Sequence, residues 1–155
     1  MDNSNLLHKQ IDSPVGPLTL IANDKALVAV HFGKNKKPEK SNSVIKEASK
    51  QLSEYFKGKR KEFDLPLEFA FGTPFQKSVW KCLLKVPYGK TQSYESQAIG
   101  IGKKKAVRAV SSAIGKNPLG IIVPCHRIIG KDKSLRGFAA GLKSKKFLLD
   151  HESVQ

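Results

Sequence analysis

The sequence predicts a mixed α/β (α+β) protein with a small N-terminal lobe, which holds an antiparallel sheet and a helix, and a mainly helical C-terminal lobe. Two observations support this fold class. Short apolar runs with period-two alternation dominate the first 70 residues, whereas capped segments with helical spacing dominate the remainder. The chain of 155 residues is long enough for one ordinary domain or two small lobes. We therefore expect a structural lobe over residues 1–70 and a second lobe over residues 71–155.

The N-terminal lobe is expected to contain three strands and one helix. An apolar run over residues 18–22, bounded by turn residues, predicts one strand, and alternation over residues 28–32 predicts another. Apolar residues spaced by three and four over residues 44–56 predict a helix that Gly58 is placed to end. Alternation of apolar residues over 63–67 predicts the third strand of this lobe.

The C-terminal lobe begins with a strong helix signal. Thr73 followed by Pro74 predicts a helix start, because the threonine hydroxyl can cap the helix and proline suits its first position. Ser93 is expected to cap a short helix that ends near residue 99, and a second helix is expected over residues 103–114. Two short helices joined by a glycine-containing turn are typical of a helix-turn-helix. Ser144 is expected to cap a last helix that ends near residue 150.

The charge of the chain is strongly basic and unevenly distributed. The net charge is +15, and residues 73–155 hold 16 Lys and Arg against 4 Asp and Glu, compared with 12 against 9 over residues 1–72. This imbalance favours a polyanionic partner such as nucleic acid over a merely solvated surface. The polar residues 1–10 lack the apolar stretch of a signal peptide, and no apolar run is long enough to span a bilayer. We therefore expect a cytoplasmic protein, nucleoid-associated in a prokaryote, that binds no membrane.

The predicted helix over residues 103–114 carries candidate DNA contacts. Lys104, between two further lysines, and Arg108 make it basic, and Arg108 and Ser112 share one face at helical spacing. Small residues such as Ala109 would let this helix approach a DNA groove closely, as a recognition helix does. A solvated basic helix over an apolar stripe explains the same pattern, so both interpretations stay open on this evidence.

The run Pro124-Cys125-His126-Arg127 is the sharpest chemical signal in the chain. A thiolate is the reactive form of cysteine, and a free thiol with a pKa of about 8.5 needs a base or a positive field to ionise. His126 and Arg127 could supply these, although a buried structural cysteine at the end of an apolar run is the favoured interpretation of an isolated Cys-His pair. Cys82 lies at helical core spacing and is interpreted as a packing residue. No Cys and His spacing resembles a zinc site, so no metal is expected.

Nearly the whole chain resembles the O6-alkylguanine-DNA alkyltransferases, also called methylated-DNA–protein-cysteine methyltransferases. The run around Cys125, with Asn117-Pro118 upstream, is highly specific to that family. The other matching segments are Ser13 to Leu20, Gly72 to Gln76, Val79-Trp80, Val86 to Thr91, Ser93-Tyr94, Arg108 to Val110, Ile122 to Gly130, Gly141-Leu142, Leu148-Leu149 and Glu152.

The resemblance implies the roles of five catalytic residues. Cys125 matches the alkyl acceptor, His126 the base that deprotonates it through a water, and Glu152 the carboxylate that orients the histidine. Asn117 matches the residue that ties the active-site turn to its loop, and Tyr94 matches the phenol that donates a proton as guanine leaves. Thiolate sulfur is a soft, strong nucleophile and therefore suits displacement at an alkyl carbon.

The resemblance also implies that the partner is double-stranded DNA containing O6-alkylguanine. The helix-turn-helix enters the minor groove, and the damaged base is flipped out of the stack into a pocket while Arg108 fills the vacated space. The further residues expected to contact DNA are Ser93, Thr91, Lys104, Ala109 and Ser112. The reaction gives a thioether that no ordinary side chain can hydrolyse, so each molecule reacts once. We expect a monomer without any cofactor, active also on O4-alkylthymine.

The chain departs from the family pattern around the expected pocket. Ser111 stands where glycine is frequent, Phe138 where tyrosine is common, and Ala140 where glycine is usual. These side chains bear on the width of the pocket and so on its tolerance for large alkyl groups.

Three other functions are weighed against alkyl transfer. A non-catalytic protein that binds alkylated DNA would lack the cysteine, whereas Cys125 is present. A plain helix-turn-helix regulator would leave the Pro-Cys-His-Arg run unexplained. A cysteine hydrolase would need water to release its adduct.

Overall fold

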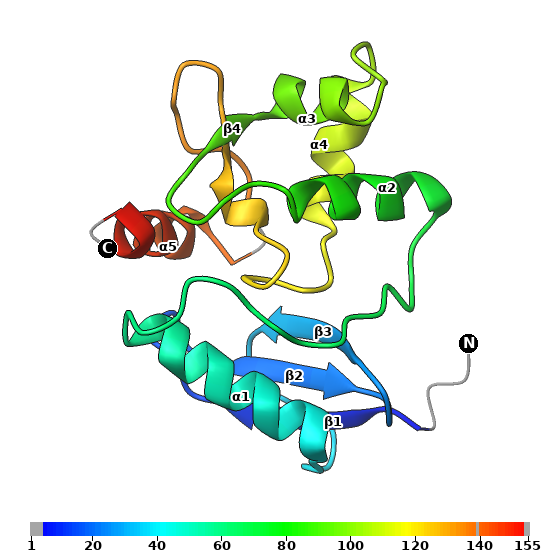
Figure 1. Cartoon of the computed structure of the whole chain (residues 1–155), viewed down its shortest axis with the longest axis vertical. Helices are drawn as coiled ribbons and strands as arrows, with labels where there is room; N and C mark the ends of the chain where they lie inside the picture. The colour runs from blue at the N-terminus through cyan, green and yellow to red at the C-terminus, as the bar shows by residue number, and fades with distance from the viewer. Residues whose placement is uncertain (1–4, 139, 154–155) are drawn as a thin grey trace. The chain divides into compact units, whose positions relative to one another are not determined.

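The computed structural model describes residues 5–138 and 140–153, which form two compact units (Figure 1). The first unit contains the described residues up to Ala70 together with Pro118–Ile122, and the second contains Phe71–Asn117 and the described residues from Val123 onward. Three parts of the two expected lobes lie outside the described residues: residues 1–4 of the first lobe, and Ala139 and residues 154–155 of the second. Among those described, no helix combines the length and apolar character needed to cross a membrane.

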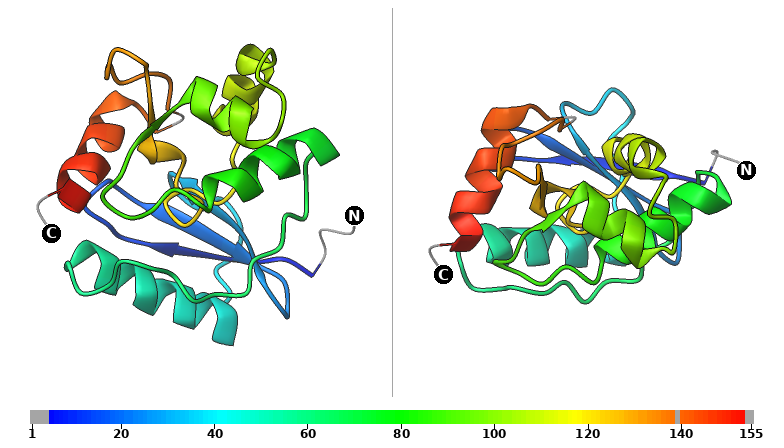
Figure 2. Two further views of the ribbon diagram at one scale, coloured as in Figure 1. Left: turned by 45° about the horizontal axis from the view of Figure 1, so that its top comes forward. Right: turned by 90° about the horizontal axis from the view of Figure 1, so that it is seen from above.

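The first unit is built on a three-stranded antiparallel sheet with the order β1-β2-β3. The strands β2 (Leu18–Ala22) and β3 (Leu27–Phe32) confirm the two predicted strands. The strand β1 (Leu7–Ile11) was not predicted, because three consecutive polar residues separate its two apolar ends and it is only half-buried along its length. Helix α1 (Ser43–Phe56) lies along one face of this sheet and contacts β2 and β3 (Figures 1 and 2).

The third strand predicted over residues 63–67 is wrong. Only one isolated bridge forms there, between Leu27 and Leu67, with the Leu27 N–H donating to the Pro66 carbonyl at 2.8 Å and the Glu68 N–H donating to the Leu27 carbonyl at 3.0 Å. Pro66 has no N–H to give to a ladder, so the segment runs beside β3 without becoming a strand of the sheet.

The predicted helix of the first unit is confirmed as α1. The Asn42 side chain caps its start by accepting the Ile45 N–H at 2.9 Å, and Gly58 follows its end with a φ of +74°. A left-handed residue just after a helix suits glycine, as the sequence indicated. The buried positions of α1 include Ile45, Ala48 and Leu52, which repeat at the helical spacing that predicted this element.

The second unit is mainly helical, as predicted, and holds one short parallel pairing between β4 (Gln92–Ser93) and β5 (Ile128–Ile129). The remaining elements are α2 (Pro74–Leu83), α3 (Tyr94–Gly100), α4 (Val107–Gly115), the 3₁₀ helix η1 (Cys125–Arg127) and α5 (Leu142–Ser153).

Two predicted caps organise the start of the second unit. Thr73 and Gln76 form a reciprocal capping box at the start of α2, and the Ser93 hydroxyl accepts a backbone N–H in the first turn of α3. The Trp80 indole N–H donates to the buried Ala113 carbonyl at 2.8 Å and so joins α2 to α4. The helix-turn-helix pair α3–α4 is therefore held against a third helix by a specific buried bond.

The predicted start of α4 at residue 103 is wrong. Gly102, with a φ of +74°, turns the chain after α3, and a separate turn follows in which the Ala106 N–H donates to the Lys103 carbonyl at 2.8 Å. Helix α4 begins only at Val107, after an alanine that offers no side-chain cap. Lys104 and its lysine neighbours consequently lie in the exposed connection between the helices and not on α4.

The predicted bounds of the last helix are also wrong. Gly141 turns the chain with a φ of +91°, and its carbonyl accepts the Lys145 N–H at 3.2 Å, so α5 starts at Leu142 and Ser144 lies inside it. The helix continues to Ser153 and therefore includes Glu152. The carboxylate expected beyond the helix is instead carried by its buried face.

A buried ion pair joins α5 to η1 and to the loop after α2. The Arg127 guanidinium donates from Nε and Nη2 to the two carboxylate oxygens of Glu152 at 2.8 and 3.0 Å, and from Nη1 to the Val86 carbonyl at 2.7 Å. The Gly89 N–H donates to the same carboxylate at 3.3 Å. A buried arginine and glutamate are tolerated because each charge is matched by the other and by further hydrogen bonds.

Between Asn117 and Val123 the chain leaves the second unit and returns to it. The Val30 N–H donates to the Pro118 carbonyl at 2.9 Å, and the Gly120 N–H donates to the Val30 carbonyl at 3.1 Å. A Cβ on Gly120 would lie 2.6 Å from the Phe32 ring, so only glycine allows this close approach. The segment Pro118–Ile122 thereby becomes part of the first unit.

We predict that Glu152→Gln lowers the free energy of unfolding by about 3–5 kcal/mol, because it leaves the buried Arg127 charge without its partner. Urea denaturation measures this difference. The matched control is Asp150→Asn on the same helix, which breaks the exposed Lys146–Asp150 pair and should cost less than about 1 kcal/mol. Equal losses in the two variants would contradict the assignment of Glu152 as the linking group of this unit.

Candidate active site and DNA-facing surface

Cys125 opens η1 and lies buried, with 7% of its surface exposed. The side-chain amide of Asn117 donates to the Cys125 sulfur at 3.2 Å and to the Val123 carbonyl at 2.8 Å. Asn117 and Val123 flank the loop of residues 118–122, so this amide links the two ends of that loop. The predicted pair of Asn117 and Cys125 is therefore brought into direct contact.

The surroundings of Cys125 act on its pKa in opposite directions. Burial raises the pKa of the thiol above its ordinary value, because a charged sulfur loses hydration. The Asn117 hydrogen bond, the positive charge of Lys145 and backbone N–H groups of Cys125 and His126 oppose this effect. Burial is the largest influence, so the resting protein holds a thiol whose proton must be taken up by another group during reaction.

His126 is fully buried, and its Nε2 atom lies 2.6 Å from the Glu152 carboxylate. Burial lowers the pKa of the imidazole although Glu152 acts to raise it, so the ring is neutral near neutral pH. A neutral imidazole donates from one nitrogen and accepts at the other, and a carboxylate takes the donor. Nε2 therefore carries the hydrogen and Nδ1 is an acceptor, which has no hydrogen-bond partner among the described residues.

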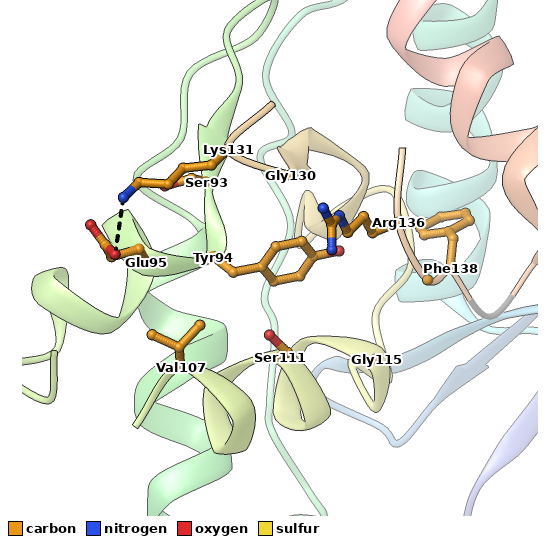
Figure 3. A pocket seen from close by; sticks show the side chains of 11 residues that line it. Ser93, Tyr94, Glu95, Val107, Ser111, Gly115, Gly130, Lys131, Arg136 and Phe138 are labelled. Carbon is orange, nitrogen blue, oxygen red and sulfur yellow. Dashed lines mark hydrogen bonds and ion pairs between the residues drawn. The ribbon is translucent and has the colours of Figure 1, made fainter. Parts of the chain in front are cut away.

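A cavity of about 470 Å³ lies between α3, α4 and the segment that follows β5 (Figure 3). The phenol of Tyr94 points across this cavity toward Arg136, and the Glu95–Lys131 ion pair of 3.3 Å lies at its border. Burial and the Cys125 charge raise the pKa of Tyr94, whereas the Arg136 charge lowers it. The phenol is therefore protonated at neutral pH and is able to donate a proton into the cavity.

Helix α4 presents its small residues beside this cavity. Ser111 and Gly115 line the cavity, and the neighbouring positions Arg108, Ala109 and Ser112 are exposed. Helix α4 therefore presents, beside the cavity, an exposed face of small side chains with one basic residue, Arg108. Such a face is compatible with close approach to a nucleic-acid groove.

The other predicted DNA contacts lie around the same helix pair. Ser93 caps α3 and also lines the cavity, whereas Thr91 is exposed just before β4. Lys104 is exposed in the turn before α4. Within the described residues, no group of three or more His, Cys, Asp or Glu side chains lies close enough together to hold a metal ion.

Two residues of the site were missed by the sequence analysis. Arg127 was noted only as a charge near the cysteine, yet it holds the Glu152 carboxylate that faces His126. Lys145 was not singled out, yet its side chain is buried and its charge acts on Cys125. The spacing of Lys145, Leu148 and Glu152 by three and four places them on one helix face, a signal that required the correct start of α5.

Cys82 differs in part from its predicted role as a packing residue. It is partly exposed, and a Cβ on Gly100 would lie 2.9 Å from its sulfur. The buried face of α2 is formed instead by Val79, Trp80 and Leu83. The close approach of α3 to Cys82 at Gly100 nevertheless gives this thiol a packing contact.

Comparison with known families matches both parts of the chain. Residues 6–69 match the ribonuclease-like domain of 6-O-methylguanine DNA methyltransferase, and residues 74–154 match the DNA binding domain of the same protein. A methylated-DNA–protein-cysteine methyltransferase of Methanosarcina barkeri is 47% identical over 149 residues, which is 92% of this chain and 94% of that protein. A protein of the same name from Mycobacterium tuberculosis is 42% identical over 151 residues, covering 94% of this chain and 91% of the relative.

Solved structures agree with these relatives. The M. tuberculosis O6-methylguanine methyltransferase superposes with a TM-score of 0.88 at 40% identity, covering 96% of this chain and 93% of the other. The same M. tuberculosis protein in complex with DNA gives a TM-score of 0.88 at 41% identity, with 95% and 92% of the two chains covered. With both domain matches, full-length relatives and this shared fold, the chain belongs to the 6-O-methylguanine DNA methyltransferase family.

Proposed function

We propose that this protein repairs DNA by direct reversal, moving the alkyl group of O6-alkylguanine, and also of O4-alkylthymine, onto the sulfur of Cys125. The observation that carries the proposal is a buried cysteine held by Asn117 beside a neutral histidine whose Nδ1 is an acceptor. This set supplies a nucleophile and a base, while the nearby cavity holds a protonated phenol. Relatives over most of the chain carry the name of this activity.

The proposed reaction balances without a co-reactant. His126 Nδ1 takes the Cys125 proton, through an intervening water, and the sulfur attacks the alkyl carbon while the bond from that carbon to O6 breaks. The electron pair of the broken bond stays with the guanine, and Tyr94 donates a proton to the leaving base. The histidine proton later returns to the phenolate through solvent. The products are unmodified guanine and a thioether on Cys125.

The Glu152 carboxylate orients the base in this scheme. It accepts the Nε2–H of His126, which fixes the tautomer that leaves Nδ1 able to accept. Arg127 in turn holds Glu152 by two hydrogen bonds, so the acceptor of the His126 hydrogen bond is itself fixed in place. Asn117 has the corresponding role for the nucleophile, because its amide group donates both to the Cys125 sulfur and to the Val123 carbonyl.

We further propose that duplex DNA binds to α4 and its neighbours through the minor groove, with the damaged base flipped into the cavity. The exposed face formed by Arg108, Ala109 and Ser112 adjoins a cavity of about 470 Å³, which supports this proposal. In this proposal Arg108 fills the space that the flipped base vacates. Lys104, Thr91 and Ser93 add contacts around the same helix pair. A related protein has been crystallised with DNA, which supports this kind of partner.

The chemistry sets further properties of the proposed protein. It needs neither metal nor organic cofactor, because the thiol displaces the alkyl group without oxidation or reduction. It reacts once per molecule, because the thioether has no route to hydrolysis. We propose that it acts as a monomer in the compartment that holds the DNA, the cytoplasm or nucleoid.

We predict that incubation with a short duplex containing O6-methylguanine adds one methyl group to the protein, and at most one. Intact-mass measurement detects this addition, and Cys125→Ala should show none, whereas Cys82→Ala should react like the unaltered protein. Turnover of many duplexes per protein, or tight binding to the lesion without any mass change, would contradict alkyl transfer to Cys125.

We predict that Arg108→Ala slows repair of duplex DNA by about tenfold or more and changes reaction with a free O6-alkylguanine base little. The reason is that unstacking a base costs a few kcal/mol, which only the duplex requires. Single-turnover rates on the two substrates measure the difference. Lys50→Ala, which removes an exposed charge on α1, is the matched control and should slow neither reaction. Equal losses on both substrates in Arg108→Ala would contradict the flipping role.

A further inference from the structure

Lys145 is a buried lysine that the proposed reaction does not use. Only 1% of the surface of Lys145 is exposed. Lysine is almost never buried to this degree unless another group matches its charge. It projects from the first part of α5, on the same helix face as Leu148 and Glu152. A buried ammonium in a protein of this size calls for a physical reason.

The contacts of Lys145 point to the cavity. Its ammonium donates to the Arg136 carbonyl at 2.8 Å and lies 5.8 Å from the centre of the Tyr94 ring. Arg136 and Phe138 line the cavity, so the hydrogen bond holds the backbone that carries them (Figure 3). Lys145 thus joins α5 to the cavity-lining segment and to the phenol that is proposed to donate a proton.

The charge of Lys145 is not matched by a carboxylate among the described residues. The Glu152 carboxylate already pairs with the Arg127 guanidinium and contacts the His126 imidazole. Asp150 pairs with Lys146 on the exposed side of α5. Lys145 and Cys125 act on each other's pKa, and the Lys145 charge also acts on the pKa of His126. The Tyr94 ring lies beside the ammonium, and the backbone of Arg136 accepts its hydrogen bond. Arg136 is itself a cation, the imidazole of His126 is neutral and the phenol of Tyr94 is protonated, so none of the three supplies a counter-charge.

The thiolate of Cys125 is therefore the anion that can match this ammonium. The two groups act on each other in both directions: the Lys145 charge lowers the pKa of Cys125, and the Cys125 charge raises that of Lys145. Burial has the larger effect on the lysine and lowers its pKa to about 8, so the ammonium still carries its charge at neutral pH. The nucleophile thus forms against a positive charge that is already in place.

We propose that Lys145 is a positioning residue for alkyl transfer, which fixes the cavity wall through the Arg136 carbonyl and supplies the counter-charge against which the Cys125 thiolate forms. This inference rests on the proposed function for its biological meaning, whereas the counter-charge role also holds for the Cys125 thiol without any DNA substrate. A cation placed where negative charge develops acts without reorganisation at the moment of reaction. The lysine thereby offsets part of the cost of ionising a buried sulfur.

The direct test is the pH profile of Cys125 reactivity in Lys145→Met, an unbranched neutral replacement of similar length. Carbamidomethylation by iodoacetamide, followed by the mass of the Cys125 peptide, reports thiolate formation without DNA. In Lys145→Met we expect the pH at which Cys125 becomes reactive to increase by about one unit. The alkylation rate near neutral pH should then be about tenfold lower than in the unaltered protein. The deficit should shrink above pH of about 8, where the unaltered protein loses the Lys145 charge.

Matched variants separate charge from structure. Lys143→Met removes an exposed lysine of the same helix and should leave the profile unchanged. Lys145→Arg keeps the charge, so its profile should rise at the original pH even if its overall rate falls. Thermal unfolding of each variant confirms that it is folded. A loss in Lys145→Met that is the same at every pH, or no loss at all, would overturn the counter-charge role.

The outcome for Lys145 can be distinguished from that of the proposed function. Transfer from O6-methylguanine duplex to Cys125 in the unaltered protein tests the function, and the iodoacetamide profile tests Lys145. If transfer occurs and the profile does not move in Lys145→Met, this inference fails alone. If the profile moves but no methyl group is transferred, the lysine still tunes the thiol and the proposed function fails.

Discussion

The Glu152 carboxylate is the group on which the second unit depends. It lies almost fully buried and accepts hydrogen bonds from the Arg127 guanidinium, the His126 imidazole and the Gly89 backbone. One anion thereby connects the last helix, the short helix that carries the cysteine, and the loop after α2. Such a carboxylate is stable in the interior only while all these donors remain in place, so it holds three separate segments in one arrangement.

The chemistry of the site follows from that constraint. Burial lowers the pKa of His126 and outweighs the opposing effect of the Glu152 carboxylate, whose charge Arg127 also matches, so the ring stays uncharged and keeps an acceptor at Nδ1. The thiol beside it is protonated at rest because burial raises its pKa, and Asn117 and Lys145 limit that effect. In the resting protein both the His126 base and the Cys125 thiol are uncharged, so neither leaves an unmatched charge in the interior. The charged pair forms only during the reaction, when the thiolate gives its electrons to the substrate.

The sequence predicted those features that local signals encode. Thr73 and Ser93 cap their helices as expected, and the fold class and the helix-turn-helix pair follow from periodicity and glycine turns. Boundaries set by the backbone alone were missed: α4 starts at an uncapped alanine, and α5 starts after a left-handed glycine. The contacts of Arg127 with a residue 25 positions away, and of Lys145 with the cavity wall, depend on tertiary packing that no local pattern contains.

The central claim is that a carbon atom moves from DNA to Cys125, and isotope labelling tests it most directly. A duplex carrying one O6-methylguanine with a deuterated methyl group is mixed with the protein, and the peptides and the nucleosides are then analysed by mass spectrometry. We expect the label on the Cys125 peptide in equal amount to the guanine restored in the DNA. Label recovered as methanol in solution, or on a peptide containing Cys82, would contradict it.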